Sequence, residues 1–273
     1  MNKLELGNKG AGIVGGVIGA AVGLVGGPAG SIAGGAVGSI VADALKDFAE
    51  RTLSSRERVR LDSATSYIAD GIEQELTAGR VVRQDGFFEG DANFTNKGAE
   101  LLEGVLLKCK AQYQEKKVRL IANIFRSVAF DASISAQAAY QMLNFADNLT
   151  YQQMCIIAFY GRKLEDFGLR LFNDRFHIYK AEAIGLDTWA SARDLLELFR
   201  QEILTAGGNS FFEHTVINPS NLSIAPRGEV AFKMLGLDKV STADISEAMR
   251  PLEYHDCWGI SKENTVNGVD VGV

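Results

Sequence analysis

Prolines and cysteines are scarce in this 273-residue chain, which has 4 prolines and 3 cysteines. The cysteines, Cys109, Cys155 and Cys257, are odd in number and far apart, and no C-x-x-C motif is present. This spacing argues against a disulfide framework and a paired-cysteine metal site, and it favours a reducing compartment. Few prolines are typical of a helical chain, because proline interrupts a helix unless it lies in the first turn.

Catalytic motifs are also missing. The sequence contains no P-loop, no H-E-x-x-H and no G-x-S-x-G motif, and its three histidines are scattered. His255, Asp256 and Cys257 form the one local cluster of nucleophile-capable groups. Catalytic Cys and His residues usually come from distant positions that meet in the fold, so we interpret this cluster as incidental. We therefore predict no enzymatic activity, no catalytic residues, no cofactor and no metal site.

Positive charge is not in excess, because the 28 Lys and Arg residues are outnumbered by 34 Asp and Glu residues. The formal net charge of −6 argues against a general nucleic-acid binder, which would present a basic face. Residues 164–179 interleave aromatic and basic side chains, a pattern that can stack single-stranded nucleic acid. The acidic chain opposes that interpretation, so we do not expect nucleic acid as a partner.

What the sequence has in abundance is glycine, concentrated in residues 10–42, which carry no charged side chain. On a helix at about 100° per residue, the glycines from Gly12 to Gly27 gather in an arc of about 120°, and the bulky side chains take the other side. A turn is predicted at Pro28, before a second limb, 28–45, in which Val37 and Val41 share the glycine side. The glycines expected to pack against other backbones are Gly12, Gly15, Gly16, Gly19, Gly23, Gly27, Gly30, Gly34 and Gly38.

The energetic cost of these glycines favours a membrane. Glycine destabilises a helix interior by about 1 kcal/mol relative to alanine, so such a helix should unravel in water. In hydrocarbon the backbone must hydrogen-bond to itself, and close packing of small residues adds contacts. Each limb has about 16 to 18 residues, slightly fewer than the ~20 that span a bilayer. Thinning, shallow insertion or oligomerisation would accommodate that length.

Three other interpretations of the stretch compete with a membrane hairpin. Gly10, Gly12 and Gly15 match G-x-G-x-x-G, but no strand precedes them and no acid follows at the required distance. A secretory signal is opposed by Glu5 and by the glycine density. A buried hairpin in a soluble oligomer or virion remains the strongest rival, because glycine-rich helices can also pack in water-soluble assemblies.

A helical body is predicted after the hairpin. Ser54 and Glu57 form a capping box that begins a helix reaching about Ala78, with a solvated charged face. Its expected apolar stripe is Val59, Ala64, Ile68, Ile72 and Leu76. In the following loop, Phe87 and Phe88 are expected to fill a gap in the core. Further helices are predicted at 95–130, 133–148, 150–163, where Thr150 and Gln153 form a second capping box, and 189–204.

The last part of the chain changes character. Two short strands, 211–217 and 222–224, are expected to form a hairpin. A helix then begins at Pro226 and ends at Gly236, and a final helical turn covers 244–249. The predicted fold is mostly α, with a glycine-zipper hairpin, a multi-helix body and a small C-terminal, winged-helix-like hairpin. The predicted domains are 1–45 (zipper), 46–94 (connecting helix and loop), 95–252 (body) and 253–273 (tail).

A local basic cluster lies within the predicted body, around Glu115. It could meet anionic lipid head groups, or it could be an ordinary solvated surface, which is the more common role of such a cluster. Its members are Lys108, Lys110, Lys116, Lys117 and Arg119.

The glycine spacing, Gly15/Gly19/Gly23/Gly27 and then Gly30/Gly34/Gly38, resembles that of glycine-zipper membrane domains. These occur in bacterial envelope proteins, secreted pore formers and small effectors of anti-phage or abortive-infection systems, and the likeness covers residues 10–45 only. It implies a bilayer, further copies of the chain and a sensor or partner protein as partners, in the bacterial cytoplasm and at the inner membrane.

The leading hypothesis for function is a defence effector that oligomerises through its zipper and makes a bilayer leak. A soluble structural or assembly protein, of phage or bacterial origin, is the first alternative. A regulator with a winged-helix-like end is the second, and because the presumed wing has no Lys or Arg before Arg227, that end is expected to dock a protein rather than DNA.

Overall fold

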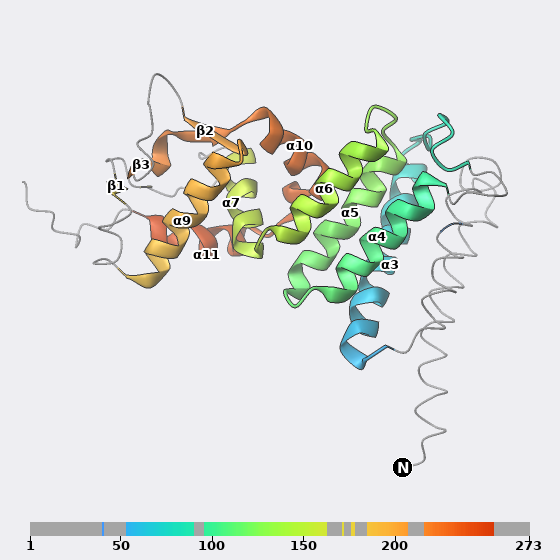
Figure 1. Ribbon diagram of the computed structural model, residues 1–273, viewed down its shortest axis with the longest axis horizontal. Coiled ribbons are helices and arrows are strands. Elements are labelled where there is room, and N and C mark those ends of the chain that lie inside the picture. The colour runs from blue at the N-terminus through green and yellow to red at the C-terminus, as the bar shows by residue number, and fades with distance from the viewer. Residues whose placement is uncertain are drawn as a thin grey trace, which may run out of the picture.

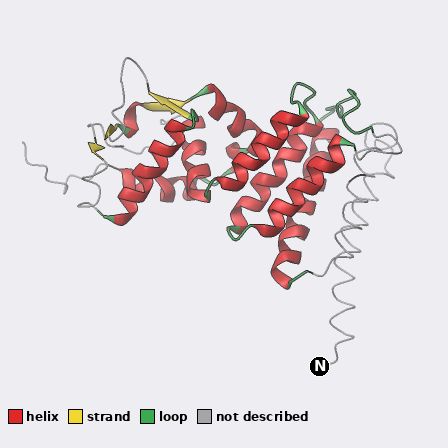
Figure 2. Cartoon of the chain, in the orientation of Figure 1, coloured by secondary structure: helices red, strands yellow, loops and turns green. Residues whose placement is uncertain are grey.

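The computed structural model describes residues 40, 53–89, 96–162, 171, 176–177, 185–206 and 216–253 (Figure 1). Within these ranges the fold is mostly helical, with two short antiparallel strand pairs (Figure 2). The mostly-α prediction is confirmed. The predicted zipper hairpin and tail lie outside the described residues, apart from Ile40 and Glu253.

The first group of helices is built around α5, Val118–Ala129. It contacts α3 (Ser55–Thr77), α4 (Lys97–Ala111) and α6 (Ala136–Asn148), which lie beside it in Figure 1. Every side chain from Leu120 to Phe125 is buried. A helix buried on nearly all sides is the centre of a core rather than a surface helix. A short 3-10 helix, η1 (Glu115–Lys117), leads into it.

The second group comprises α7 (Tyr151–Gly161), α9 (Leu186–Arg200), α10 (Pro226–Leu235) and α11 (Thr242–Met249). Helix α10 contacts both α5 and α7, so it joins the two groups. Three further 3-10 turns are η3 (Pro219–Asn221), η4 (Leu237–Lys239) and η5 (Arg250–Leu252). A single hydrophobic cluster runs through both groups, from Leu61 to Leu252.

The predicted helix caps are confirmed. The Ser54 side chain accepts from the Glu57 backbone N–H, and the Glu57 carboxylate accepts from the Ser54 N–H, which completes the first capping box. Thr150 and Gln153 form the second box at the start of α7. Gly236 ends α10 with a left-handed backbone, φ 64°, a conformation that glycine adopts without steric cost.

The predicted hairpin between residues 211–217 and 222–224 is wrong. Strand β4 (Leu222–Ile224) pairs instead with β2 (Leu204–Ala206), and β3 (Val216–Ile217) pairs with β1 (Phe176–His177), both antiparallel. The β2–β4 pair is extended by Ala225, whose N–H donates to the Ile203 carbonyl at 2.9 Å. Within the described part of these segments, Val216–Ile217 and Leu222–Ile224 therefore do not pair with each other.

The predicted helix 189–204 is four residues too long at its end. Helix α9 stops at Arg200, and Glu202 takes a left-handed backbone with φ 59°, the one positive φ at a non-glycine residue among the described residues. The turn redirects the chain, so that Ile203 and Leu204 are buried and Leu204 begins β2. A non-glycine residue in this conformation signals a sharp, packed corner.

The predicted stripe of α3 is wrong at Val59, whose side chain is 61% exposed. Leu61 is buried in its place, and the buried side of the helix continues through Ala64, Ile68 and Ile72. The predicted solvated face is wrong at Glu75, which is 15% exposed and lies 3.1 Å from the Arg126 guanidinium. Glu75 turns inward because α5 presents an arginine to it.

Helix α3 and the loop that follows it share the core of the body. Helix α3 contacts α4 and α5, and Val82, Phe87 and Phe88 all belong to the hydrophobic cluster. A side chain at Gly98 would overlap the Phe88 ring, so the ring fills space that the glycine leaves open. The interpretation of the two phenylalanines as core residues is confirmed.

Candidate functional site

The predicted packing glycines, from Gly12 to Gly38, lie outside the described residues. So do His255, Asp256 and Cys257, and so do the side chains of 164–179 other than Leu171. Ile40 is the one described residue before Leu53. It has helical backbone, its side chain is 7% exposed, and it belongs to the hydrophobic cluster of the body. Ile40, near the end of the uncharged stretch, therefore belongs to the core of the body.

The predicted basic cluster does not form one basic surface. Lys117 is buried, and its ammonium donates to the Asp147 carbonyl at 2.9 Å, so burial lowers its pKa. Lys108 donates to the Asp147 carboxylate at 2.5 Å. Lys116 instead reaches Asp244, at 2.5 Å. Both interpretations of the cluster, a lipid-facing surface and an ordinary solvated surface, are wrong for Lys117.

Asp244, near the start of α11, links the two groups of helices. Its carboxylate accepts from Lys116 in η1 and from the Tyr151 hydroxyl in α7, at 2.5 and 2.8 Å. These hydrogen bonds, with Lys116 the larger cause, lower the pKa of Asp244 to about 2. Burial and the hydrogen bond to Asp244 raise the pKa of Tyr151. The arrangement holds the carboxylate ionised and the phenol neutral, which suits a structural contact and not a general acid or base.

The described cysteines are not activated nucleophiles. Cys109 and Cys155 are buried free thiols, and burial raises the pKa of each to about 12. A nucleophilic cysteine needs the opposite environment, a lowered pKa and access to substrate. Among the described residues, no group of three or more His, Cys, Asp and Glu side chains could hold a metal ion.

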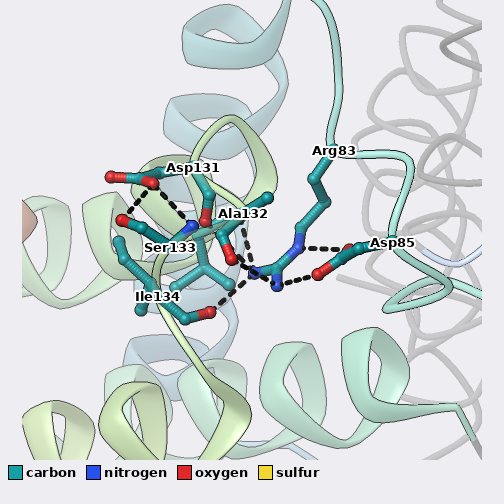
Figure 3. A network of polar contacts seen from close by, with 7 residues as sticks. Arg83, Asp85, Asp131, Ala132, Ser133 and Ile134 are labelled. Atoms are coloured by element: carbon teal, nitrogen blue, oxygen red, sulfur yellow. Dashed lines mark hydrogen bonds and ion pairs between the residues drawn. The ribbon is translucent and has the colours of Figure 1, made fainter.

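Arg83 lies at the centre of a network of polar contacts (Figure 3). Its guanidinium binds the Asp85 carboxylate in a two-pronged contact, Nε to Oδ1 at 2.8 Å and Nη2 to Oδ2 at 2.5 Å. Nη1 also donates to the carbonyls of Val128, Asp131 and Ile134, at 3.3, 3.3 and 2.8 Å. The side chain is 3% exposed. Arg83 therefore supplies further donors to carbonyls at and just beyond the end of α5.

The Arg83 network is a structural clamp. Asp85 pairs with the guanidinium, whose hydrogen bond lowers the pKa of the carboxyl to about 2. The Phe87 ring lies 4.1 Å from the guanidinium carbon, a cation–π contact that leaves the group no open face there. An arginine so enclosed can orient a loop but offers little to a ligand.

A groove of about 830 Å³ opens between α6, α7, α9 and α10. Its most distinctive feature is a row of carboxamides, and Gln141, Asn144 and Asn148 lie along one side of α6 at helical spacing. Carboxamides both donate and accept hydrogen bonds, so they can bind polar chains or ligands. The lining is completed by Phe145, Leu149, Gln153, Glu197, Gln201 and Arg227.

The end of the groove near α10 is held in place by Arg227. Its Nη1 donates to the Gln201 carbonyl at 3.2 Å, and its guanidinium carbon lies 5.8 Å from the centre of the Phe145 ring. Gln153 is already occupied, because its amide donates to Asp194 at 2.9 Å and its oxygen accepts from the Thr150 N–H. The lining as a whole consists of five carboxamides, one carboxylate, one guanidinium and two apolar side chains.

Sequence reasoning missed the groove because its walls come from four helices. The row of Gln141, Asn144 and Asn148 was the one available signal, since these carboxamides repeat at i, i+3 and i+7. A polar row at that spacing is also what an ordinary solvated helix face shows, so the row alone does not indicate a groove.

Comparisons with protein-family models, with curated proteins and with solved structures found no match. Among the described residues, no helix combines the length and apolar character needed to cross a membrane.

Proposed function

We propose that this chain is a membrane-acting protein that oligomerises through its glycine zipper and perturbs a bilayer, as a bacterial anti-phage effector would. The observation that carries the proposal is the one-sided glycine arc in the uncharged residues 10–42. Such an edge lets two backbones approach closely, and it is favourable where water does not compete for the backbone.

The chemistry of the body supports assigning the effect to the zipper. Buried thiols, an ion-paired Asp244 and a clamped Arg83 offer no reactive group among the described residues. The carboxamide groove offers binding instead, and we propose it as the surface for a sensor or partner protein. In this scheme the body restrains the zipper, which is released slowly in the chain alone and faster when a partner binds at the inner membrane.

Vesicle flotation tests the membrane assignment. The purified full chain, mixed with vesicles of phosphatidylethanolamine and phosphatidylglycerol, should rise with the lipid through a density gradient. A matched chain with Gly15→Asp and Gly19→Asp should stay at the bottom, because charges at the centre of a membrane helix are costly. If the wild-type protein also stays at the bottom of its gradient, the membrane assignment is refuted.

The rival function is a soluble structural or assembly protein whose glycine hairpin packs within an oligomer. The burial of Ile40 in the protein core favours this rival, because it places part of the second limb against protein. Fractionation of expressing cells separates the two proposals. The membrane-acting proposal predicts that a fraction of the protein sediments with membranes and resists a high-salt wash. Recovery of all the chain in the soluble fraction, as an oligomer by light scattering, would support the assembly role.

A further inference from the structure

Helix α6, which forms one wall of the groove, has no charged side chain at an exposed position. Its exposed polar side chains are all carboxamides, namely Gln137, Gln141, Asn144 and Asn148. The one charged residue of α6, Asp147, does not line the groove and pairs with Lys108. In a chain of which 23% is charged, a solvated helix face normally carries charges. Depletion of charge is instead typical of a surface that a partner covers.

Much of the hydrogen-bonding capacity of the groove is uncommitted. In the part of the chain that the structure describes, the carboxamides of Gln141 and Asn144 have no hydrogen-bond partner. Asn148 donates through Nδ2 to the Asn144 carbonyl at 2.9 Å, which leaves its Oδ1 open. Oε1 of Gln201 is buried and also has no partner among the described residues, although its Nε2 donates to Glu197 at 2.6 Å. Because nearly all buried polar atoms are hydrogen-bonded, a ligand donor would be bound favourably at this oxygen.

The open groups match the main chain of an extended polypeptide. A carboxamide offers donors and an acceptor, and each residue of an extended chain offers an N–H and a C=O. A helix, by contrast, has already paired these groups within itself. Along α6, Asn144 and Asn148 are about 6 Å apart at the helical rise of about 1.5 Å per residue. That separation is close to the ~6.6 Å between alternate residues of an extended chain.

The charge and size of the groove also suit a polypeptide main chain. The lining carries one carboxylate, Glu197, and one guanidinium, Arg227, so its charges balance. A nucleic acid would need an excess of positive charge, whereas a main chain is neutral. The volume of about 830 Å³ lies within the ~300–1,000 Å³ typical of small-ligand sites, so the groove accommodates a short segment.

We propose that the groove binds an extended segment of a partner protein through the main chain of that segment. Gln141 and Asn144 pair with its N–H and C=O groups, and Oε1 of Gln201 accepts from one further N–H. The inference rests on the proposed role of the groove in partner binding and is independent of the glycine zipper. Since every sequence has these main-chain groups, the backbone of the segment contributes more to affinity than its side chains do.

Gln141→Leu with Asn144→Leu, compared with Gln137→Leu, tests where the segment binds. All three positions are exposed on α6, but Gln137 does not line the groove. The probes are short random-sequence peptides, selected by display on the full wild-type chain and then measured by fluorescence anisotropy. Their affinity should fall at least tenfold in the groove variant and less than twofold in Gln137→Leu. Equal affinities in the three chains for every selected peptide, or a selection that yields no binder, would overturn the inference.

N-methylation of the selected peptides tests the main-chain contact in the wild-type chain, so it does not depend on how any variant folds. Methylation at alternate residues removes the N–H donors from one side of an extended peptide. One of the two alternate sets should weaken binding at least tenfold, and the other less than threefold. If neither set weakens binding, the main-chain contact is overturned.

An oligonucleotide probe and the flotation assay separate the inference from its rivals. The wild-type chain should bind a fluorescent oligothymidine at least tenfold more weakly than it binds a selected peptide. Tighter binding of the oligonucleotide, lost in Gln141→Leu with Asn144→Leu, would overturn the assignment to a polypeptide. Peptide binding by a chain that does not float with vesicles would support the groove and refute the membrane function. Flotation without groove-dependent peptide binding would refute the groove alone.

Discussion

Arg83 shows how one side chain can order a loop that has no regular secondary structure. Its hydrogen bonds join the loop after α3 to carbonyls in the last turn of α5 and just beyond it, about fifty positions later in the sequence. A planar guanidinium is suited to this role because it presents several N–H donors in one plane. The loop is therefore specified by a buried cation rather than by turn residues alone.

Replacement of Arg83 by alanine should lower the free energy of unfolding by about 3 kcal/mol, because it removes the donors to the Ala132 and Ile134 carbonyls and the partner of the Asp85 carboxylate. Arg83→Lys keeps the charge but loses the two-pronged geometry, so a loss of about half that size is expected. Urea unfolding followed by circular dichroism measures both. Arg56→Ala, at an exposed arginine of α3, should change the free energy by less than about 0.5 kcal/mol. An Arg83→Ala chain as stable as Arg56→Ala would contradict the clamp.

Asp244 predicts an acid-sensitive contact between the two helix groups. Its folded pKa, about 2, lies below the ordinary Asp value, so the unfolded state binds more protons as the pH falls. The stabilisation is present in full above the unfolded pKa and is lost between about pH 5 and pH 2. Urea midpoints should therefore decline with falling pH more steeply in wild type than in Asp244→Asn. Asp85 adds a similar decline in both chains, so parallel curves would contradict the role of Asp244.

At the scale of elements, the β2–β4 corner depends on a glycine at the start of α10. A side chain at Gly228 would overlap the Ile203 carbonyl, a backbone group that also accepts from the Ala225 N–H. Helix α10 can approach β2 this closely only because position 228 lacks a Cβ atom. The corner in turn positions Arg227 at the end of the groove.

Gly228→Ala should therefore destabilise the protein by about 3 kcal/mol, since backbone overlap cannot be relieved by a side-chain rotation. The matched control is Gly104→Ala in α4, where the added Cβ would lie 3.1 Å from a flexible Leu143 methyl. There the gain in helix propensity, up to about 1 kcal/mol, should roughly offset the crowding. Thermal unfolding of the two variants compares them directly, and equal melting temperatures would contradict the close approach.

Elements whose signals lie within four or five residues were predictable from the sequence. The capping boxes at Ser54 and Thr150 and the end of α10 at Gly236 are where the sequence places them, because each cap is a contact between near neighbours. Strand pairing was not predictable in this way. Partners for Leu222–Ile224 are chosen by the corner at Glu202 and by packing at Gly228, neither of which is a hairpin signal.

Side-chain burial was likewise predictable where it depends on neighbours in the sequence, and not where it depends on distant residues. The burial of Met154 to Tyr160 follows from an unbroken apolar run, so it could be predicted. The inward turn of Glu75 and the burial of Lys117 could not, because their partners Arg126 and Asp147 lie on other helices. A charged side chain is rarely fully buried unless it is paired, and here the partners come from other helices. The candidate groove could not be predicted either, because its lining comes from four helices.

At the scale of the whole molecule, the described residues form a helical body whose core includes Ile40, near the end of the glycine-rich stretch. The body has one continuous core and, in the part that the structure describes, surfaces suited to binding. On this account the zipper acts on the membrane and the body determines when it does so. The account therefore depends on the glycine edge as a packing surface rather than as a flexible linker.

Dye release from phosphatidylethanolamine and phosphatidylglycerol vesicles, with the glycine edge changed in the full chain, tests that claim most directly. Gly19→Leu with Gly23→Leu should reduce the release rate at least tenfold while the body keeps its circular dichroism, because leucines hold the backbones apart. Val17→Leu with Val22→Leu, on the bulky side, should leave the rate within about twofold of wild type, since that side is not the packing edge. Undiminished release by the glycine-substituted chain would contradict the account.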